Sequence, residues 1–186
     1  MATVGVSDLA MAAFPTSVQL LARNAANILT PAIDVNYPIR TTDVIVQGSK
    51  VKIPVRIHFR RELTNSRMTA MEVKLAIECL RTRSTDGYLR QAALRCILPA
   101  PMPWVVPFVV LLAGEYVVEI ADELYAAIPA LDVDIYARFV IENRPLIRLL
   151  RARAKSYWDC FYRNLYADYH SYPGLKFLYQ LERWAA

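Results

Sequence analysis

The clearest pattern in the chain is an alternation of apolar and polar residues over positions 51–60. Successive side chains of a β-strand point to opposite faces, so this period of two predicts a strand with one apolar face. The apolar positions are Val51, Ile53, Val55, Ile57 and Phe59. Pro54 cannot donate a backbone hydrogen bond, which predicts an edge strand or a bulge at that position.

A second short apolar run, from Val44 to Val46, precedes this strand. Gly48 and Ser49 lie between the two runs and suit a tight turn whose first central residue has positive φ. The sequence therefore predicts one β-hairpin over residues 43–60.

Apolar residues at helical spacing predict a first helix over residues 18–29. A hydroxyl from Thr16 or Ser17 is expected to cap its first turn, and Pro31 is expected to end it. Residues 1–14 hold few large apolar side chains, so we expect them to be loosely attached.

From residue 67 onwards the apolar period is close to 3.6, which is typical of helices, and proline or glycine separates successive segments. Met71, Cys79 and Cys96 are among the residues expected to point inward. The expected helices span 67–82, 87–98, 103–128, 134–142, 145–166 and 175–184.

The helix over 103–128 is expected to organise the fold, because Trp104 to Gly114 carries no charge and a helix that is apolar all round is usually buried. Ile97 to Gly114 is also uncharged over nearly the length of a membrane span. Four prolines interrupt it, however, which favours a turn followed by a buried helix and argues against a membrane association.

The predicted fold class is therefore mainly α (α+β). It is an irregular multi-helix bundle, or a stack of helix pairs, around a central buried helix, with one β-hairpin in the N-terminal third. We expect one domain over 1–186, in which 1–65 hold the first helix and the hairpin and 66–186 form the helical core.

The composition and net charge of the chain argue against several classes of protein. The chain has 186 residues, 55% of them hydrophobic, and a net charge of +5, which argues against disorder and is modest for a dedicated nucleic-acid binder. Its three cysteines have no C-x-x-C spacing, and the N-terminus lacks a basic signal region. These features predict a cytoplasmic protein without a disulfide framework, structural zinc or another cofactor.

Four carboxylates follow the apolar segment at positions that share one face of a helix. They are Glu115, Glu119, Asp122 and Glu123. Such a set could form an acid/base pair or part of a metal site, but His58 and His170 lie in no Glu-x-x-His motif, so no metal is predicted. Ion pairing with arginines is the preferred interpretation, and Glu115 is expected to be buried and to face an arginine.

Two sets of cations are candidates for binding a polyanion. One is a stripe at helical spacing, formed by Arg144, Arg148, Arg151 and Lys155, and the other is the polar side of the strand, with Lys52, Arg56 and Arg60. Solvated or paired side chains explain the first set equally well, and protection of an exposed sheet edge explains the second.

Aromatic residues concentrate in the C-terminal third. Tyrosine and tryptophan bury large areas while keeping a polar tip, which favours interfaces. The candidate interface residues are Tyr157, Trp158, Phe161, Tyr162 and Trp184.

The sequence holds no nucleophile elbow and no glycine-rich phosphate loop. The leading hypothesis is therefore a non-enzymatic interaction or assembly protein that binds itself or another protein. The alternatives are a nucleic-acid-binding or regulatory protein that uses the two basic sets, and an enzyme that uses Glu115 and Glu119.

Overall fold

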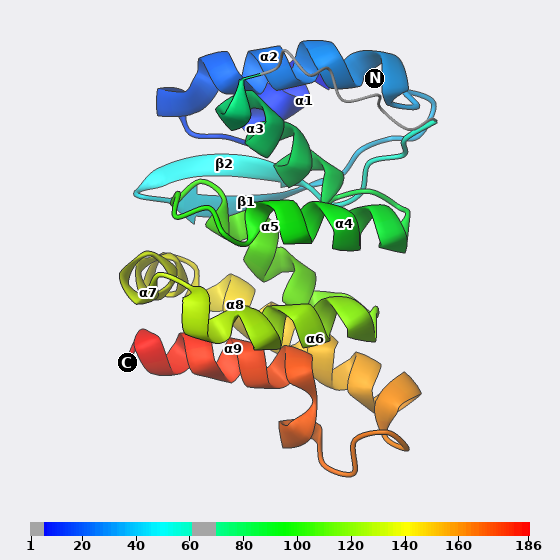
Figure 1. Cartoon of the computed structure of the whole chain (residues 1–186), viewed down its shortest axis with the longest axis vertical. Helices are drawn as coiled ribbons and strands as arrows, with labels where there is room; N and C mark the ends of the chain where they lie inside the picture. The colour runs from blue at the N-terminus through cyan, green and yellow to red at the C-terminus, as the bar shows by residue number, and fades with distance from the viewer. Residues whose placement is uncertain (1–5, 61–69) are drawn as a thin grey trace. The chain divides into compact units, whose positions relative to one another are not determined.

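The computed structural model describes residues 6–60 and 70–186 and is mainly α-helical. Over these ranges it has nine α-helices and one two-stranded antiparallel sheet, which confirms the predicted fold class (Figure 1). The chain divides into two compact units, Met1–Ile97 and Leu98–Ala186. Each unit is described by itself below. In the described residues, no helix is both long enough and apolar enough to cross a membrane.

The N-terminal unit contains four helices and the hairpin. Their bounds are α1 Val6–Ala12, α2 Gln19–Leu29, β1 Thr41–Val46, β2 Ser49–Pro54, α3 Met71–Arg81 and α4 Gly87–Ile97. In this unit α1 packs on α2 and β2, α2 on α3, and α3 on α4.

The hairpin forms where the sequence predicts it, with Val46 paired to Ser49. Its two central turn residues are Gln47 and Gly48, with φ values of 49° and 78°. Both are positive, as in the two-residue turn that matches the twist of paired strands. The predicted turn at Gly48 and Ser49 was therefore wrong by one residue.

The second strand ends at Pro54, so the predicted continuation to residue 60 is wrong. The chain beyond it is held by separate backbone bonds. The Ile57 N–H donates to the Arg83 carbonyl at 2.7 Å, and the Arg60 N–H donates to the Ala32 carbonyl at 2.7 Å. The alternation of apolar and polar residues in the sequence therefore continues beyond the end of the hydrogen-bonded strand pair.

Two expectations for the N-terminal segment are corrected. Residues 1–5 of the segment predicted to be loosely attached lie outside the described residues. Its described part is anchored, because Leu9 in α1 and Ala13 and Phe14 after it are buried. Helix α2 has no side-chain cap. Instead, the Gln19 side chain in its first turn donates to the carbonyls of Met11 and Phe14, which ties α2 to the end of α1.

Helices α3 and α4 occur where helices were predicted, but two of their inward positions were wrong. Met71, at the start of α3, is 78% exposed, and Cys96 in α4 is also exposed, whereas Cys79 is buried. The start at residue 67 that was predicted for the helix over 67–82 lies outside the described residues. The Asp86 carboxylate caps α4 by accepting from the Tyr88 N–H at 2.9 Å.

The C-terminal unit contains the other five helices. They are α5 Val106–Val110, α6 Val118–Ala127, α7 Val133–Glu142, α8 Arg144–Tyr157 and α9 Pro173–Trp184. Helix α9 packs on α6, α7 and α8, and Figure 1 shows it running alongside α6.

The predicted central helix over 103–128 is buried in its first half but is not one helix. Helix α5 and a 3₁₀ segment, Leu111–Gly114, are followed by extended backbone at Glu115, and α6 begins only at Val118. Gly114 lies against α8, where an added Cβ would come 2.6 Å from the Cδ2 atom of Leu150. Glycine and the β-branched Val117 and Val118 are also poor helix formers, which favours a break here.

The predicted helix over 145–166 is also shorter than expected. Helix α8 ends at Tyr157, and one π-helical turn, Trp158–Tyr162, follows it. Single π turns are rare and often occur at functional sites. Helix α7 occurs as predicted, and the Asp132 carboxylate caps it by accepting from the Ile135 N–H at 3.0 Å.

Candidate interaction surfaces

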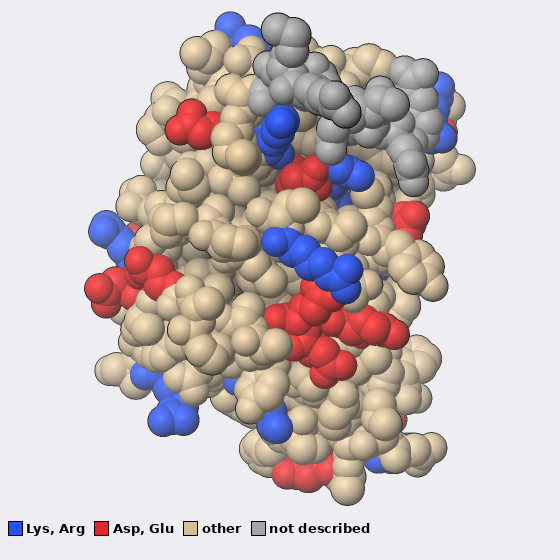
Figure 2. Space-filling model, in the orientation of Figure 1, with Lys and Arg blue, Asp and Glu red and all other residues tan. Residues whose placement is uncertain are grey.

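The structure separates the four predicted carboxylates. Glu119, Asp122 and Glu123 belong to α6, and acidic side chains gather over this helix in Figure 2. Glu115 precedes the helix in extended backbone and is 5% exposed. Its burial was predicted correctly, but the common helical face was not, because Glu115 is not helical. The pairing of Glu115 with an arginine stays a prediction.

Asp122 is the carboxylate of this set whose environment changes its pKa. Partial burial raises the Asp122 pKa, while a hydrogen bond from the Tyr166 hydroxyl lowers it and the nearby Glu119 raises it. Burial and the negative charge of Asp122 raise the pKa of Tyr166 in turn. This contact joins α6 to the segment before α9. Among the described residues no group of three His, Cys, Asp or Glu side chains could hold a metal ion.

All four cations of the predicted stripe lie on α8, and three of them have partners within the C-terminal unit. Arg151 pairs with Glu182 of α9, at 3.1 Å between Nη1 and Oε2. Arg144 donates to the Ala185 carbonyl at 3.3 Å, and the Lys155 ammonium lies 4.7 Å from the centre of the Tyr169 ring. Arg148 has no hydrogen bond or ion pair among the described residues.

The same helix lines one side of a small groove in the C-terminal unit, with a volume of about 250 Å³. Its lining consists of Val140, Arg144, Ile147, Arg148, Arg151 and Glu182. Three guanidinium groups against one carboxylate leave the lining with a net charge of +2.

Two further cavities lie in this unit. One, of about 310 Å³, has mostly apolar walls between the proline-rich segment 98–101 and the start of α7. The other, of about 460 Å³, is shallow and lies beside His170 and Tyr179. Neither Glu115 nor Glu119 lines any of these three cavities.

The strand-side cations do not form the predicted strip. Only Lys52 lies on β2, opposite Asp43, whereas Arg56 and Arg60 follow the end of the strand. Arg56 donates to the Val55 carbonyl at 2.8 Å.

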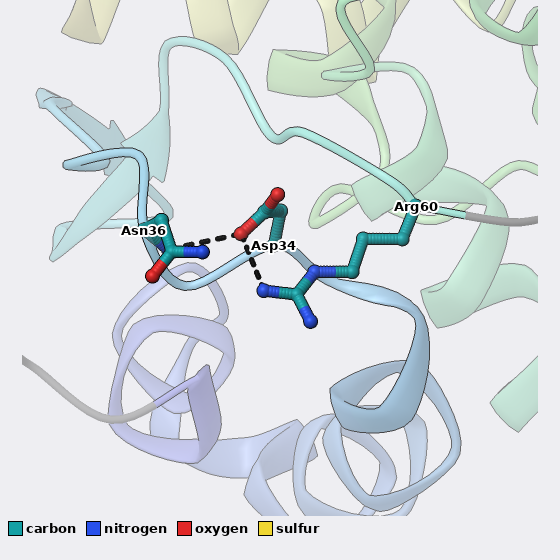
Figure 3. Close-up of polar contacts among 3 residues, drawn as sticks. All are labelled: Asp34, Asn36 and Arg60. Carbon is teal, nitrogen blue, oxygen red and sulfur yellow. Dashed lines mark hydrogen bonds and ion pairs between the residues drawn. The ribbon is translucent and has the colours of Figure 1, made fainter.

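Arg60 is bound to Asp34 (Figure 3), with 2.6 Å between Nη2 and Oδ1. The same carboxylate oxygen accepts from the Asn36 N–H at 3.0 Å. These contacts, first the bond from Arg60 and then the bond from Asn36, lower the pKa of Asp34. The pair therefore fixes the chain after α2 to the chain after β2.

The predicted interface aromatics divide into anchored and exposed residues. The Trp158 indole donates to the Tyr166 carbonyl at 2.9 Å, and the Tyr162 hydroxyl donates to the Tyr116 carbonyl. Tyr157 and Trp184 are half-buried. Phe161 is 66% exposed, although its ring lies 6.4 Å from that of Tyr157 and 6.3 Å from that of Tyr162.

Two further exposed residues of the C-terminal unit were not among the predicted interface residues. Leu165 and Tyr116 are also exposed, by 67% and 51%, and the Tyr116 ring lies 6.1 Å from that of Tyr157. Because the helical period assigned 145–166 to one helix, it treated Leu165 as part of an ordinary apolar side. We call Tyr116, Tyr157, Phe161 and Leu165 the aromatic patch.

The π turn also carries two opposite charges beside this patch. Asp159 and Arg163 are both exposed and lie 3.4 Å apart, and Cys160 between them is an exposed free thiol. The underlying layer is formed by Tyr172, which is fully buried and stacks on Tyr162 at 5.5 Å. Burial raises the pKa of the Tyr172 hydroxyl, so this layer stays uncharged.

Comparison of the chain with protein-family models, with curated proteins and with solved structures gives no match in any of the three.

Proposed function

We propose that this chain is a non-enzymatic assembly protein that forms a homodimer through the aromatic patch and the π turn. The observation that carries the proposal is the exposure of Phe161 beside the rings of Tyr157 and Tyr162, with the exposed Leu165 one turn further along the chain. Rigid aromatic side chains lose little conformational entropy on binding, so such a surface favours association.

The charges around the patch favour a second copy of the chain as the partner. Asp159 in the π turn and Arg163 directly after it are exposed and form an ion pair within the chain, with 3.4 Å between Oδ1 and Nη1. In a two-fold interface each surface meets its own copy, so Asp159 of one subunit can pair with Arg163 of the other. A single turn that carries both charges is self-complementary in this way.

Other features support the choice among the hypotheses. Arg60 and Arg151 are paired with carboxylates, so the two basic sets offer fewer uncommitted cations for a nucleic-acid backbone than their sequence suggested. The carboxylates proposed for an enzyme are split between a buried position and an exposed helix. The proposal includes a cytoplasmic location, for which the three free thiols are a supporting feature.

Sedimentation velocity of the full chain tests the dimer. Replacing Phe161 with Asp should shift the molecule to a monomer, because a charge would be buried in the interface. The matched control is Leu20→Asp on α2, since Leu20 is 70% exposed and belongs to the other unit. A wild-type chain that remains monomeric at high concentration, or equal loss of the dimer in both variants, would overturn the proposal.

Cys160 provides an independent test of where the copies meet. With diamide as the oxidant, a two-fold contact at the π turn should give a disulfide-linked dimer that is absent in Cys160→Ser and retained in Cys96→Ser. Cys96 is also an exposed free thiol, so it controls for random collision. Equal cross-linking through Cys96 would place the contact elsewhere.

A further inference from the structure

The groove along α8 is formed by three helices of the C-terminal unit, two consecutive ones and α9. Arg144, Ile147, Arg148 and Arg151 come from α8, Val140 from α7 and Glu182 from α9. Val140 and Ile147 are buried, so the guanidinium groups stand beside a fixed apolar wall. This groove does not depend on the aromatic patch, and the inference below does not rest on the proposed dimer.

The three arginines of the groove differ in how far they are committed. Arg151 is held by both carboxylate oxygens of Glu182, at 3.2 and 3.1 Å. Arg144 has one bond to a main-chain carbonyl, at 3.3 Å, which leaves most of its donors available. Arg148 is exposed and has no hydrogen bond or ion pair in the described part of the chain. Arg151 is therefore held in place, whereas Arg144 and Arg148 can turn towards a ligand.

We infer that this groove binds the phosphate group of a phosphomonoester. A phosphate monoester carries a charge of about −1.5 to −2 at neutral pH, which matches the net charge of +2 of the lining. Guanidinium groups bind phosphate oxygens through paired hydrogen bonds. Arg144 is also the first residue of α8, and the N-terminus of a helix favours negative charge.

Glu182 determines which arginines of the groove remain available to bind phosphate. Its carboxylate occupies the side of Arg151 and leaves Arg148 and Arg144 as the open donors. Removing the Glu182 charge should therefore strengthen phosphate binding, because the net charge rises and Arg151 becomes available. A role of Glu182 in stability alone would not predict tighter binding.

The test is a titration of the full ¹⁵N-labelled chain with inorganic phosphate, with ionic strength held constant by chloride. We expect saturable amide shifts around 144–151 and 182. Arg148→Gln should raise the phosphate Kd by about tenfold or more, as for the loss of one charged hydrogen-bond pair. Glu182→Gln should lower the Kd severalfold.

The matched control is Arg153→Gln, because Arg153 is another exposed arginine of α8 that does not line the groove. A Kd that stays near the wild-type value in this variant supports the site. Shifts that do not saturate, or equal weakening by Arg148→Gln and Arg153→Gln, would show non-specific attraction and overturn the inference. Both positions are exposed, and circular dichroism confirms that the variants fold.

A second titration identifies the source of the phosphate group. Phosphatidylcholine vesicles that contain phosphatidic acid replace inorganic phosphate in a sedimentation assay. Co-sedimentation that Arg148→Gln abolishes supports a phosphate site for a lipid headgroup. Saturable binding of inorganic phosphate without co-sedimentation supports a site for a soluble phosphomonoester.

Discussion

The side chain of Arg83 donates from Nε to the carbonyl oxygen of Pro54 at 3.0 Å. Its Nη2 atom donates to the Val55 carbonyl, also at 3.0 Å. Arg83 is 3% exposed, so a buried cation is used to hold the end of β2. The hydrogen-bonded strand pair ends at Pro54. From there the Arg83 side chain ties the end of β2 to the turn between α3 and α4.

Replacing Arg83 with Met should lower the free energy of unfolding by about 1–3 kcal/mol, because the Pro54 carbonyl loses its donor. The Val55 carbonyl keeps Arg56 as a donor, so the Pro54 carbonyl is the one that loses its side-chain hydrogen bond. The measurement is urea unfolding followed by circular dichroism. Arg40→Met is the matched control, since the Arg40 side chain is exposed in the same unit, and it should change the free energy by less than about 0.5 kcal/mol. Equal midpoints for both variants would contradict this role of Arg83.

The contact between Gly114 and Leu150 gives a second prediction. Gly114→Ala would place a Cβ 2.6 Å from Leu150 Cδ2, and Leu150 is fully buried and cannot move freely. The variant should be destabilised by about 1–3 kcal/mol, as is usual for overpacking.

Leu150→Val shortens the opposing side chain and provides the control for this contact. The double variant Gly114→Ala, Leu150→Val should be less destabilised than the sum of the two single variants. Simple additivity in urea unfolding would show that the two residues do not meet.

These two contacts show which features the sequence could predict. The hairpin and α7 were predicted because their signals are local: apolar residues on both sides of the turn at Gly48, and the helical period over 134–142. At the break after Gly114 the chain approaches Leu150 of a later helix, and no local pattern predicts that contact. Periodicity did not find this break, because apolar residues such as Val117 and Val118 continue after it.

The same reasoning applies to the candidate surfaces. The spacing of Arg144, Arg148 and Arg151 was sufficient to place them along one helix. It could not show that Glu182 of α9 would neutralise Arg151, or that α7 would complete a groove. The alternation past Pro54 likewise led to a cationic strand face, whereas Arg60 pairs with Asp34 of an earlier loop. Charge patterns in the sequence identify cations but not their partners.

The ion pair between Asp34 and Arg60 should be visible in an NMR titration of the Asp34 carboxyl group. We expect an Asp34 pKa below the ordinary aspartate value of about 3.9. Arg60→Gln should raise this pKa, yet leave it somewhat low, because the Asn36 N–H still donates to the carboxylate. An unchanged Asp34 pKa in Arg60→Gln would contradict the contact shown in Figure 3.

The sign of the linked effect on stability follows from the lowered pKa. A carboxyl group whose pKa is lower in the folded state stabilises the fold fully above its unfolded pKa. That contribution is lost as the pH falls through the folded pKa. The stability difference between the wild type and Asp34→Asn should therefore be constant near neutral pH and shrink below about pH 4.

The three thiols should differ in reactivity according to their burial. Cys79 is fully buried, and burial, with a smaller effect from the Glu78 carboxylate, raises its pKa well above the ordinary value. Because the thiolate is the reactive form, Cys79 should not react with Ellman's reagent in the folded chain. Cys96 and Cys160 are exposed and should react, Cys96 more slowly because partial burial raises its pKa too.

Native protein should thus release two equivalents of thionitrobenzoate, and a third only in urea. Cys96→Ser and Cys160→Ser should each remove one native equivalent. Rapid release of all three from the wild type would contradict the burial of Cys79.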